Sequence, residues 1–177
     1  RNARFGRIEG HEAICAWARH ILLQTIEMAE EDCWECLHAI VDSVFLKDVK
    51  GRDEPREAAL ALCERVSQMV AIPLEYEDEY SIIGFVPSRQ HGTGTLTRYF
   101  ALGSKGWKVR GIELRQHSTC RWISHLQNSA LSILERAGVR QVLEMFRGEI
   151  ARLQGGEVSL DELVVARRVA RDVNDYH

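Results

Sequence analysis

Residues 37–46 read Leu-His-Ala-Ile-Val-Asp-Ser-Val-Phe-Leu, and this stretch decides the fold. Its near-continuous apolar character is interrupted only at Asp42-Ser43. Short apolar runs on both sides of a polar pair are typical of buried β-strands joined by a tight turn. The stretch therefore predicts a buried β-hairpin that presents Asp42 at its tip.

Helices are predicted on both sides of this hairpin. Apolar residues recur at three- and four-residue spacing between His11 and Glu31, which indicates a helix that packs on one face. A second amphipathic helix should begin near Pro55, because proline suits a first helical turn. It should end before Pro73, since the residue that precedes a proline disfavours the helical conformation.

The rest of the chain changes from strand-like to helical patterns. Strand-like segments occur at 74–77, 81–86, 97–102 and 107–113. From residue 118 onward the apolar spacing is helical, with one helix ending at Gly138 and the next at Gly155. These patterns predict an α+β fold with a mixed region up to residue 115 and a mostly helical region over 116–177. The four tryptophans, at positions 17, 34, 107 and 122, fall mostly on apolar stripes and are predicted to lie in the core.

Composition limits the class of protein. A length of 177 residues suits one domain or two small lobes. No stretch approaches the roughly 18 to 20 apolar residues of a membrane span, and no signal-peptide pattern opens the sequence, so we expect a cytoplasmic protein. Because the chain begins at Arg1 rather than Met, we also expect it to be a piece of a longer protein.

Charge is distributed unevenly along the chain, although the net charge is only −3. A basic run contains Arg98, Lys105, Lys108, Arg110, Arg115 and Arg121. Glu113 is the single acid within that run, and we expect it to orient Arg110 or Arg115. Residues 75–79 are instead acidic, so a metal site could adjoin a phosphate site. Two ordinary solvated faces are the alternative interpretation.

Five cysteines, an odd number, indicate reduced thiols rather than a disulfide framework. Cys33 and Cys36 have the spacing of a redox or zinc half-site, which His38 and Cys63 could complete. No second Cys-x-x-Cys follows, however, and burial as small hydrophobic side chains is the favoured interpretation.

Read in order, these segments resemble the C-terminal palm and thumb of family B DNA polymerases. The matching segments are Ile14-Cys-Ala-Trp-Ala-Arg19 (family Ile-Thr-Ala-x-Gly-Arg), 37–45 (the motif C hairpin, Tyr-Gly-Asp-Thr-Asp-Ser), 73–77 (Pro-Leu-x-Leu-Glu), 97–99 (Lys-Lys-x-Tyr), 108–113 (Lys-Gly-Ile-Glu), and 163–168 with 175–176 (the end of the thumb). The residues around motif C, His-Ala-Ile-Val-Asp-Ser, are similar to those of a divergent archaeal and bacterial branch of the family. The active-site motifs of that branch are degraded. The resemblance implies that 1–115 form the C-terminal part of the palm and that 116–177 form the thumb.

The resemblance also implies a damaged metal site. Asp42 corresponds to one catalytic carboxylate and Mg²⁺ ligand, with Glu75 and Glu77 as tentative further ligands. In an extended strand the two carboxylates of an Asp-x-Asp pair point the same way, about 6.6 Å apart, and can bridge two metal ions about 3.5–4 Å apart. Ile40 stands where the first Asp belongs and cannot bind metal. Asp42 could alternatively be no more than a turn residue.

The basic residues correspond to the part of the family fold that grips DNA. The predicted DNA-binding residues are Arg98, Tyr99, Lys108, Arg110, Arg115, Arg167 and Arg168. Leu96 and Thr97 replace the two lysines of Lys-Lys-x-Tyr, which removes two positive charges expected to hold primer phosphates. The implied partners are duplex primer-template DNA and the remainder of the polymerase chain or a larger subunit, with no membrane partner. A deoxynucleoside triphosphate is implied only with the fingers and palm segments that this sequence does not contain.

Three functional hypotheses follow from the sequence. The first is a fragment of a family B DNA polymerase, of Mg²⁺-dependent nucleotidyl-transferase lineage, that acts near the nucleoid and is inactive as an isolated chain. The second is a non-catalytic DNA-binding scaffold or the small subunit of a split polymerase, which Ile40 favours. The third is an unrelated α+β domain with accidental similarity.

Overall fold

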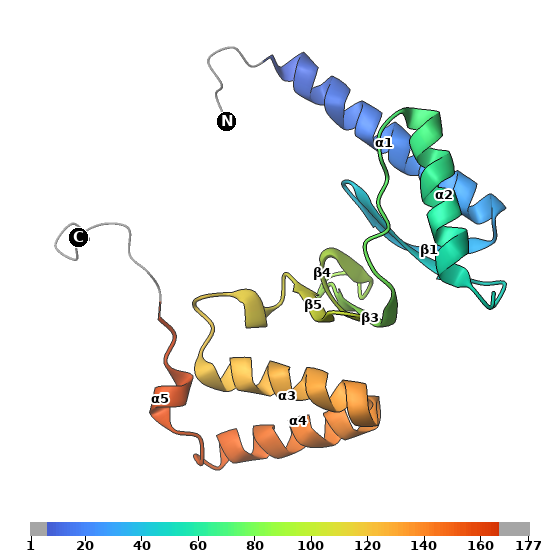
Figure 1. Cartoon of the computed structure of the whole chain (residues 1–177). Helices are drawn as coiled ribbons and strands as arrows, with labels where there is room; N and C mark the ends of the chain where they lie inside the picture. Colours follow the sequence, from blue (N-terminus) through green and yellow to red (C-terminus); the bar gives the residue numbers. More distant parts are fainter. Residues whose placement is uncertain (1–6, 167–177) are drawn as a thin grey trace. The chain divides into compact units, whose positions relative to one another are not determined.

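The computed structural model of the chain describes residues 7–166, and it confirms the α+β class. The residues form two compact units by their contacts, divided between Glu79 and Tyr80 (Figure 1). The boundary predicted from the sequence near residue 115 separates palm from thumb, which is a different division. The assignment of palm and thumb to these residues stays a prediction, because contacts within the chain do not identify either part.

The first unit consists of two helices and a two-stranded sheet. Its elements are α1 (Ile8–Glu31), β1 (Trp34–Ile40), β2 (Ser43–Asp48) and α2 (Pro55–Val70). The predicted hairpin is confirmed: β1 and β2 pair antiparallel, and Ile40 lies opposite Ser43 across a two-residue turn. The core of this unit joins α1, β1 and α2 through Ala29, Trp34, Leu62 and Val66, whose exposed fractions are 0–7%.

Arg52, in the loop between β2 and α2, packs against this core. The guanidinium of Arg52 lies 4.7 Å from the ring centroid of Trp34 and forms an ion pair with Asp48. It also donates a hydrogen bond to the Asp32 carbonyl oxygen. The backbone N–H of Arg52 and, to a smaller extent, its charge lower the pKa of Asp48. Arg52 therefore joins the end of α1 to the end of β2.

Helix α1 packs along only part of its length. Thr25 and Ala29 are buried, whereas every residue from 8 to 20 is exposed. In Figure 1 the first turns of α1 (blue) extend beyond α2, which lies beside its later turns. The prediction that Trp17 lies in the core is therefore wrong, since its exposed fraction is 67%.

Residues 71–79 form no strand, so the predicted strand at 74–77 is wrong. The stretch keeps the alternation of a strand: Leu74 packs on the first core and Tyr76 lies 5.7 Å from the Arg56 guanidinium, while Glu75 and Glu77 are exposed. Within residues 7–166 no neighbouring strand pairs with it. Alternating burial is typical of a strand, but it does not require backbone pairing.

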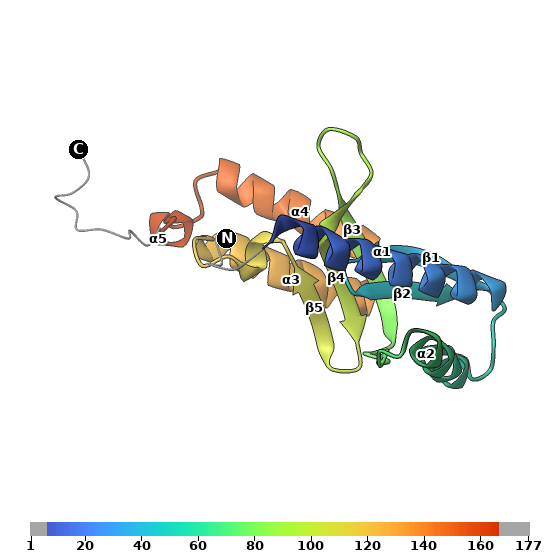
Figure 2. The same ribbon diagram turned by 90° about the horizontal axis from the view of Figure 1, so that it is seen from above.

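The second unit consists of a three-stranded antiparallel sheet and a helical hairpin. Its elements are β3 (Tyr80–Pro87), β4 (Gly94–Gly103), β5 (Gly106–Arg110), the 3₁₀ turn η1 (Glu113–Arg115), α3 (Arg121–Ala137), α4 (Val139–Gln154) and α5 (Leu160–Leu163). The sheet order is β3-β4-β5. Figure 2 shows the loop between β3 and β4 projecting from the sheet, and both views show α3 and α4 side by side.

Two small cores hold this unit together. Val109 and Ile112 pack with Leu131 of α3, which fixes the sheet to the helical hairpin. Trp122 and Leu126 pack with Val158, and the indole N–H of Trp122 donates to Glu149 Oε2 at 3.3 Å. None of the helices in residues 7–166 is long and apolar enough to cross a membrane.

Candidate functional site

Asp42 lies at the exposed tip of the β1–β2 hairpin, as predicted from the sequence. The Ser43 hydroxyl donates a hydrogen bond to its Oδ1 at 3.3 Å. Its neighbour Val41 has a φ of 52°, in the left-handed region that costs a β-branched residue about 1–3 kcal/mol. The paired strands hold the turn in this conformation, so the position of Asp42 is imposed by the hairpin rather than by local preference.

Ile40 and Asp42 do not share one extended strand. Ile40 is the last residue of β1, and Asp42 belongs to the turn that follows it. The same-face spacing expected for positions 40 and 42 therefore does not apply in this structure. The two residues lie on either side of Val41 at the hairpin tip.

Glu75 and Glu77 lie on the exposed side of residues 71–79. Tyr76 between them points inward, and burial, reinforced by the charge of Glu79, raises its pKa. Within residues 7–166, no three or more His, Cys, Asp or Glu side chains are grouped so that they could hold a metal ion. Because Mg²⁺ takes six oxygen ligands, a site at Asp42 would need ligands from elsewhere, and the metal assignment stays a prediction.

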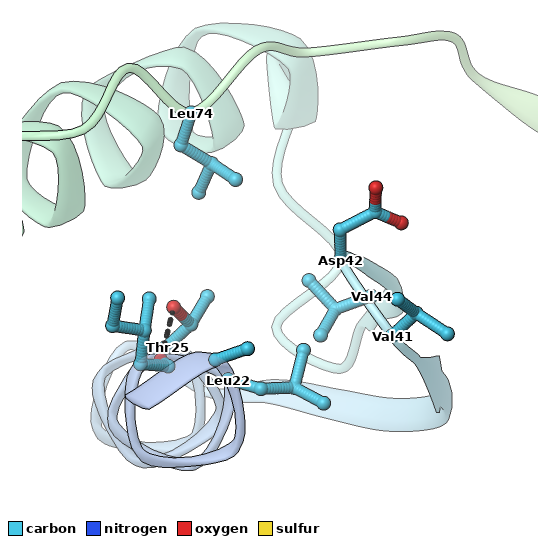
Figure 3. A pocket seen from close by; sticks show the side chains of 8 residues that line it. Leu22, Thr25, Val41, Asp42, Val44 and Leu74 are labelled. Atoms are coloured by element: carbon cyan, nitrogen blue, oxygen red, sulfur yellow. Dashed lines mark hydrogen bonds between the residues drawn. The ribbon is translucent and has the colours of Figure 1, made fainter. Parts of the chain in front are cut away.

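A small apolar pocket lies directly beside Asp42, and no sequence pattern predicts it. Its lining residues are Ala18, Ile21, Leu22, Thr25, Val41, Asp42, Val44 and Leu74. Figure 3 shows the aliphatic side chains of Leu22, Val44 and Leu74 around this space, with the Asp42 carboxylate turned away from them. The Thr25 hydroxyl is satisfied by the Ile21 carbonyl oxygen at 2.8 Å. The pocket therefore offers apolar contacts with one carboxylate at its rim.

The predicted DNA-binding residues of the second unit lie on different sides of the sheet. Lys108 and Arg110 are opposite Ala101 and Tyr99 across the β4–β5 ladder, so all four share one face. Lys108 Nζ lies 3.3 Å from the Tyr80 hydroxyl, whereas Arg110 is exposed. Arg98 alternates with Tyr99 along β4 and belongs to the other face.

Tyr99 differs from the other predicted DNA contacts because it is buried. Its exposed fraction is 6%, and its ring lies 6.1 Å from that of Phe85 on the neighbouring strand. A side chain in this position packs the sheet. Within this structure Tyr99 is therefore part of the core that supports the basic residues.

Glu113 contacts Arg98, not Arg110 or Arg115 as expected from the sequence. Arg98 Nη2 lies 3.2 Å from Glu113 Oε1, and Arg98 Nε donates to the Gly111 carbonyl oxygen at 3.0 Å. Gln116 donates to the other Glu113 oxygen at 2.5 Å. The pairing joins residues 15 positions apart, so nearness in sequence could not reveal it.

Gly111 makes the contact between Arg98 and Glu113 possible. Its φ is +63°, and a Cβ there would overlap the Thr97 carbonyl oxygen and lie 3.0 Å from Arg98 Cγ. The chain can therefore cross close to β4 at this point only without a side chain. Arg115 is exposed at the end of η1. Arg167 and Arg168 lie outside the described residues.

The two units carry opposite net charge. Residues 7–79 contain seven basic and seventeen acidic residues, a net charge of −10. Residues 80–166 contain eleven basic and seven acidic residues, a net charge of +4. The small net charge of the whole chain hides this difference. A polyanion would therefore be attracted to the second unit and repelled by the first.

All five cysteines are free. Burial raises the pKa of Cys36 and Cys63, so these thiols stay protonated at neutral pH. Neither thiol has the depressed pKa of a reactive nucleophile.

A likeness to a known class of protein extends over nearly the whole chain rather than over one motif. The chain superimposes on a family B DNA polymerase from Pyrobaculum calidifontis with a TM-score of 0.69 at 21% identity, over 98% of this chain and 21% of that one. The fold is therefore that of a segment of a family B DNA polymerase. No protein-family profile matches the sequence.

The relatives found by sequence are also DNA polymerases. The chain is 26% identical over 167 residues to a DNA polymerase from Archaeoglobus fulgidus, covering 93% of this chain and 20% of that protein. It is 36% identical over 101 residues to DNA polymerase 2 from Saccharolobus solfataricus, covering 57% and 14%. The chain is thus related to archaeal DNA polymerases and corresponds to a segment of the family B fold, which confirms the resemblance. It spans a fifth or less of the length of these two relatives.

Proposed function

We propose that the chain is the part of a family B DNA polymerase that holds the primer-template duplex, with 1–115 in the palm and 116–177 in the thumb. The observation that carries this proposal is the relationship to an archaeal DNA polymerase across 93% of the chain. The fold supports it, because the same segment order occurs in a family B polymerase. Its place of action would be the cytoplasm, at the nucleoid.

Duplex phosphates would contact the second unit. The net charge of +4 on residues 80–166 and the exposed Arg110 and Arg115 support this assignment. Contacts of this kind position DNA without reading its sequence, so binding should be general rather than specific. The Arg98 side chain is 41% exposed, but its charge is partly neutralised by Glu113, which makes it the weaker contact.

The proposed chemistry is nucleotidyl transfer in a complete polymerase. Mg²⁺ ions, when bound, would activate the primer 3′-hydroxyl and stabilise the leaving pyrophosphate. Asp42 is exposed at the hairpin tip and would supply one carboxylate oxygen to them. Ile40 offers no ligand, so catalysis should be impaired even when the other polymerase segments and a deoxynucleoside triphosphate are present.

DNA binding tests the first part of this proposal. We expect the chain to bind a fluorescent 20-base-pair duplex, with an affinity that falls steeply as salt rises. Substituting Arg110→Glu and Arg115→Glu should weaken binding equally on unrelated sequences and lower the salt slope by about 1 for each lost phosphate contact. Fluorescence anisotropy over a salt series measures both quantities.

Glu113→Gln serves as a control that should change the affinity for DNA in the opposite direction. It removes one negative charge beside Arg98, so it should strengthen DNA binding rather than weaken it. Binding that is insensitive to salt, or that depends strongly on DNA sequence, would contradict the proposed phosphate contacts.

Primer extension tests the proposed loss of chemistry. In a polymerase reconstituted from this chain and the remaining segments, Ile40→Asp should raise the extension rate by at least tenfold, because it adds a carboxylate to the Mg²⁺ site. Ile40→Asn, which lacks the charge, is the matched control. If the reconstituted enzyme already extends primers at ordinary polymerase rates with Ile40 in place, the assignment of position 40 is wrong.

A second candidate function is a DNA-binding scaffold that has lost catalysis altogether. Ile40 is the observation that favours it. In that case Ile40→Asp would not restore extension, while the salt-dependent binding of duplex DNA would remain.

A further inference from the structure

A histidine and a cysteine lie in contact on α1 and have no part in the activities proposed above. Cys15 Sγ lies 3.7 Å from His11 Nε2. Both residues belong to the exposed first turns of α1, residues 8–20. The pair is separate from the hairpin that presents Asp42 and from the basic residues of the second unit. Its chemistry therefore has to be considered by itself.

The spacing of the two residues is that of two metal ligands on one helix. Residues four apart lie on the same face of a helix, one turn above the other. Two histidines at this spacing bind Zn²⁺ in the His-Glu-x-x-His motif. In this chain a thiol takes the place of the second imidazole. Thiolate sulfur and imidazole nitrogen are both ordinary ligands of Zn²⁺, so the change of residue keeps the metal chemistry.

The distance between the two ligand atoms fits a shared metal ion. Zn²⁺ binds a thiolate sulfur at about 2.3 Å and an imidazole nitrogen at about 2.0–2.1 Å, in tetrahedral geometry. These bond lengths and a tetrahedral angle place the sulfur and the nitrogen about 3.6 Å apart. The observed separation is 3.7 Å. The two side chains therefore already have the separation that one ion requires.

The donor atoms also select the class of metal. One nitrogen and one sulfur suit Zn²⁺ rather than Mg²⁺ or Ca²⁺, which take oxygen ligands. Within residues 7–166, no third His, Cys, Asp or Glu joins the pair to form a larger metal-binding group. Both residues are exposed, so water can fill the two remaining tetrahedral positions. The pair thus differs in metal from the Mg²⁺ site proposed at Asp42.

Metal binding at this place has a consequence for α1. Residues 8–20 are all exposed, whereas Thr25 and Ala29 further along the helix are buried. Figure 1 shows these first turns extending beyond α2. Most helical stability in proteins comes from tertiary packing, so turns without it are only marginally stable in water. An ion that binds both His11 and Cys15 holds one of these turns closed and stabilises the helical form.

We propose that His11 and Cys15 form a Zn²⁺-binding pair that stabilises the exposed first turns of α1. The Cys15 thiol gives up its proton to solvent on binding. The resulting thiolate sulfur and His11 Nε2 each donate an electron pair to the ion, whose oxidation state does not change. Neither Asp42 nor the basic residues of the second unit take part, so zinc binding and the proposed function can fail independently.

Cobalt titration of the full chain under reducing conditions tests the metal site. Co²⁺ is the spectroscopic substitute for Zn²⁺, and a thiolate ligand gives it a sulfur-to-cobalt charge-transfer absorption. We expect this absorption to increase with added Co²⁺ and to disappear when excess Zn²⁺ displaces the cobalt. Cys15→Ser should abolish it, and His11→Gln should weaken Co²⁺ binding at least tenfold, because each removes one of two protein ligands.

Cys33→Ser is the matched control for the cobalt titration. Cys33 is also a free thiol, and it has the Cys-x-x-Cys spacing to Cys36. The substitution should leave the charge-transfer absorption unchanged. An absorption that Cys33→Ser removes and Cys15→Ser retains would overturn the inference, since the thiolate ligand would then lie outside α1. Absence of the absorption in the unsubstituted chain would overturn it as well.

Amide hydrogen exchange tests the effect of the metal on α1. Zn²⁺ should slow exchange in residues 12–19 of the unsubstituted chain and leave exchange in α2 unchanged. The same addition should have no effect on the Cys15→Ser variant, whose fold is checked by circular dichroism. Cobalt binding at the pair without slower exchange in α1 would contradict the stabilising role.

Duplex binding separates zinc binding from the proposed function. Cys15→Ser should leave the affinity for duplex DNA unchanged, and the Arg110→Glu, Arg115→Glu variant should leave cobalt binding unchanged. Loss of cobalt binding in Cys15→Ser with DNA binding intact is the expected result. A parallel loss of both in Cys15→Ser would mean that the substitution disturbs the fold or that the two sites are coupled, and it would overturn the independence stated above.

Discussion

Gly111→Ala should lower the free energy of unfolding of the second unit by about 2–5 kcal/mol, from a strained φ together with overpacking. The residue has a φ of +63°, and an added methyl group would overlap the Thr97 carbonyl oxygen. Relief requires β5 to move away from β4, which also separates Arg98 from Glu113. The expected result is faster amide hydrogen exchange across β4 and β5.

Gly92→Ala is the matched control for this substitution. Gly92 has nearly the same φ, +68°, but no atom lies within 4 Å of an added Cβ. The alanine there should cost only about 1 kcal/mol, because the backbone strain is present without the overlap. Equal destabilisation by both substitutions would show that the close approach at Gly111 is unimportant.

Leu62→Ala should lower the free energy of unfolding of the first unit by about 2–5 kcal/mol. Leu62 is only 2% exposed, and it packs with Ala29, Trp34 and Val66 where α1, β1 and α2 meet. Truncation removes apolar contact and leaves a cavity that a helix pair cannot easily close. Urea unfolding followed by tryptophan fluorescence measures the shift, since Trp34 lies in the same cluster.

Leu60→Ala provides the comparison on the same helix. Leu60 is 46% exposed, so its truncation removes little buried surface and should change stability by less than about 1 kcal/mol. A similar loss at both positions would mean that the contacts of Leu62 do not form the main core of this unit.

The hairpin could be predicted from the sequence because its signals are local. Apolar runs on both sides of Asp42-Ser43 determine the strands, and two residues suffice for the turn. The helices that end at Gly138 and Gly155 were predicted for the same reason. In each case the pattern and the structural element occupy the same few residues.

Features that depend on distant partners were not predictable in this way. The stripe on α1 predicts a packed face, but it does not say that packing begins only near Ile21. Alternation at 74–77 predicts a strand, yet a strand needs a neighbour to pair with. The Glu113 carboxylate meets Arg98 because β4 and η1 come together in the fold, although Arg110 and Arg115 are closer in sequence.

The candidate site also combines a feature that local sequence predicts with features that depend on distant residues. Asp42 could be placed at a turn from sequence, whereas the pocket beside it requires Leu22 of α1 and Leu74 of residues 71–79 to meet the hairpin. Tyr99 is grouped with the basic residues because the resemblance matches it to the tyrosine of Lys-Lys-x-Tyr. Adjacent residues on a strand point to opposite faces, and burial of the Tyr99 ring follows from the face it occupies.

The two-stranded sheet has a consequence for solubility. Within residues 7–166, β1 and β2 pair only with each other, so each has one edge to which no other strand is paired. Open edges promote aggregation by strand addition. The net charge of −10 on residues 7–79 opposes such contacts between copies, because like-charged surfaces repel at long range. The negative charge of these residues thus opposes self-assembly through the unpaired strand edges, and high salt would weaken this opposition by screening the charges.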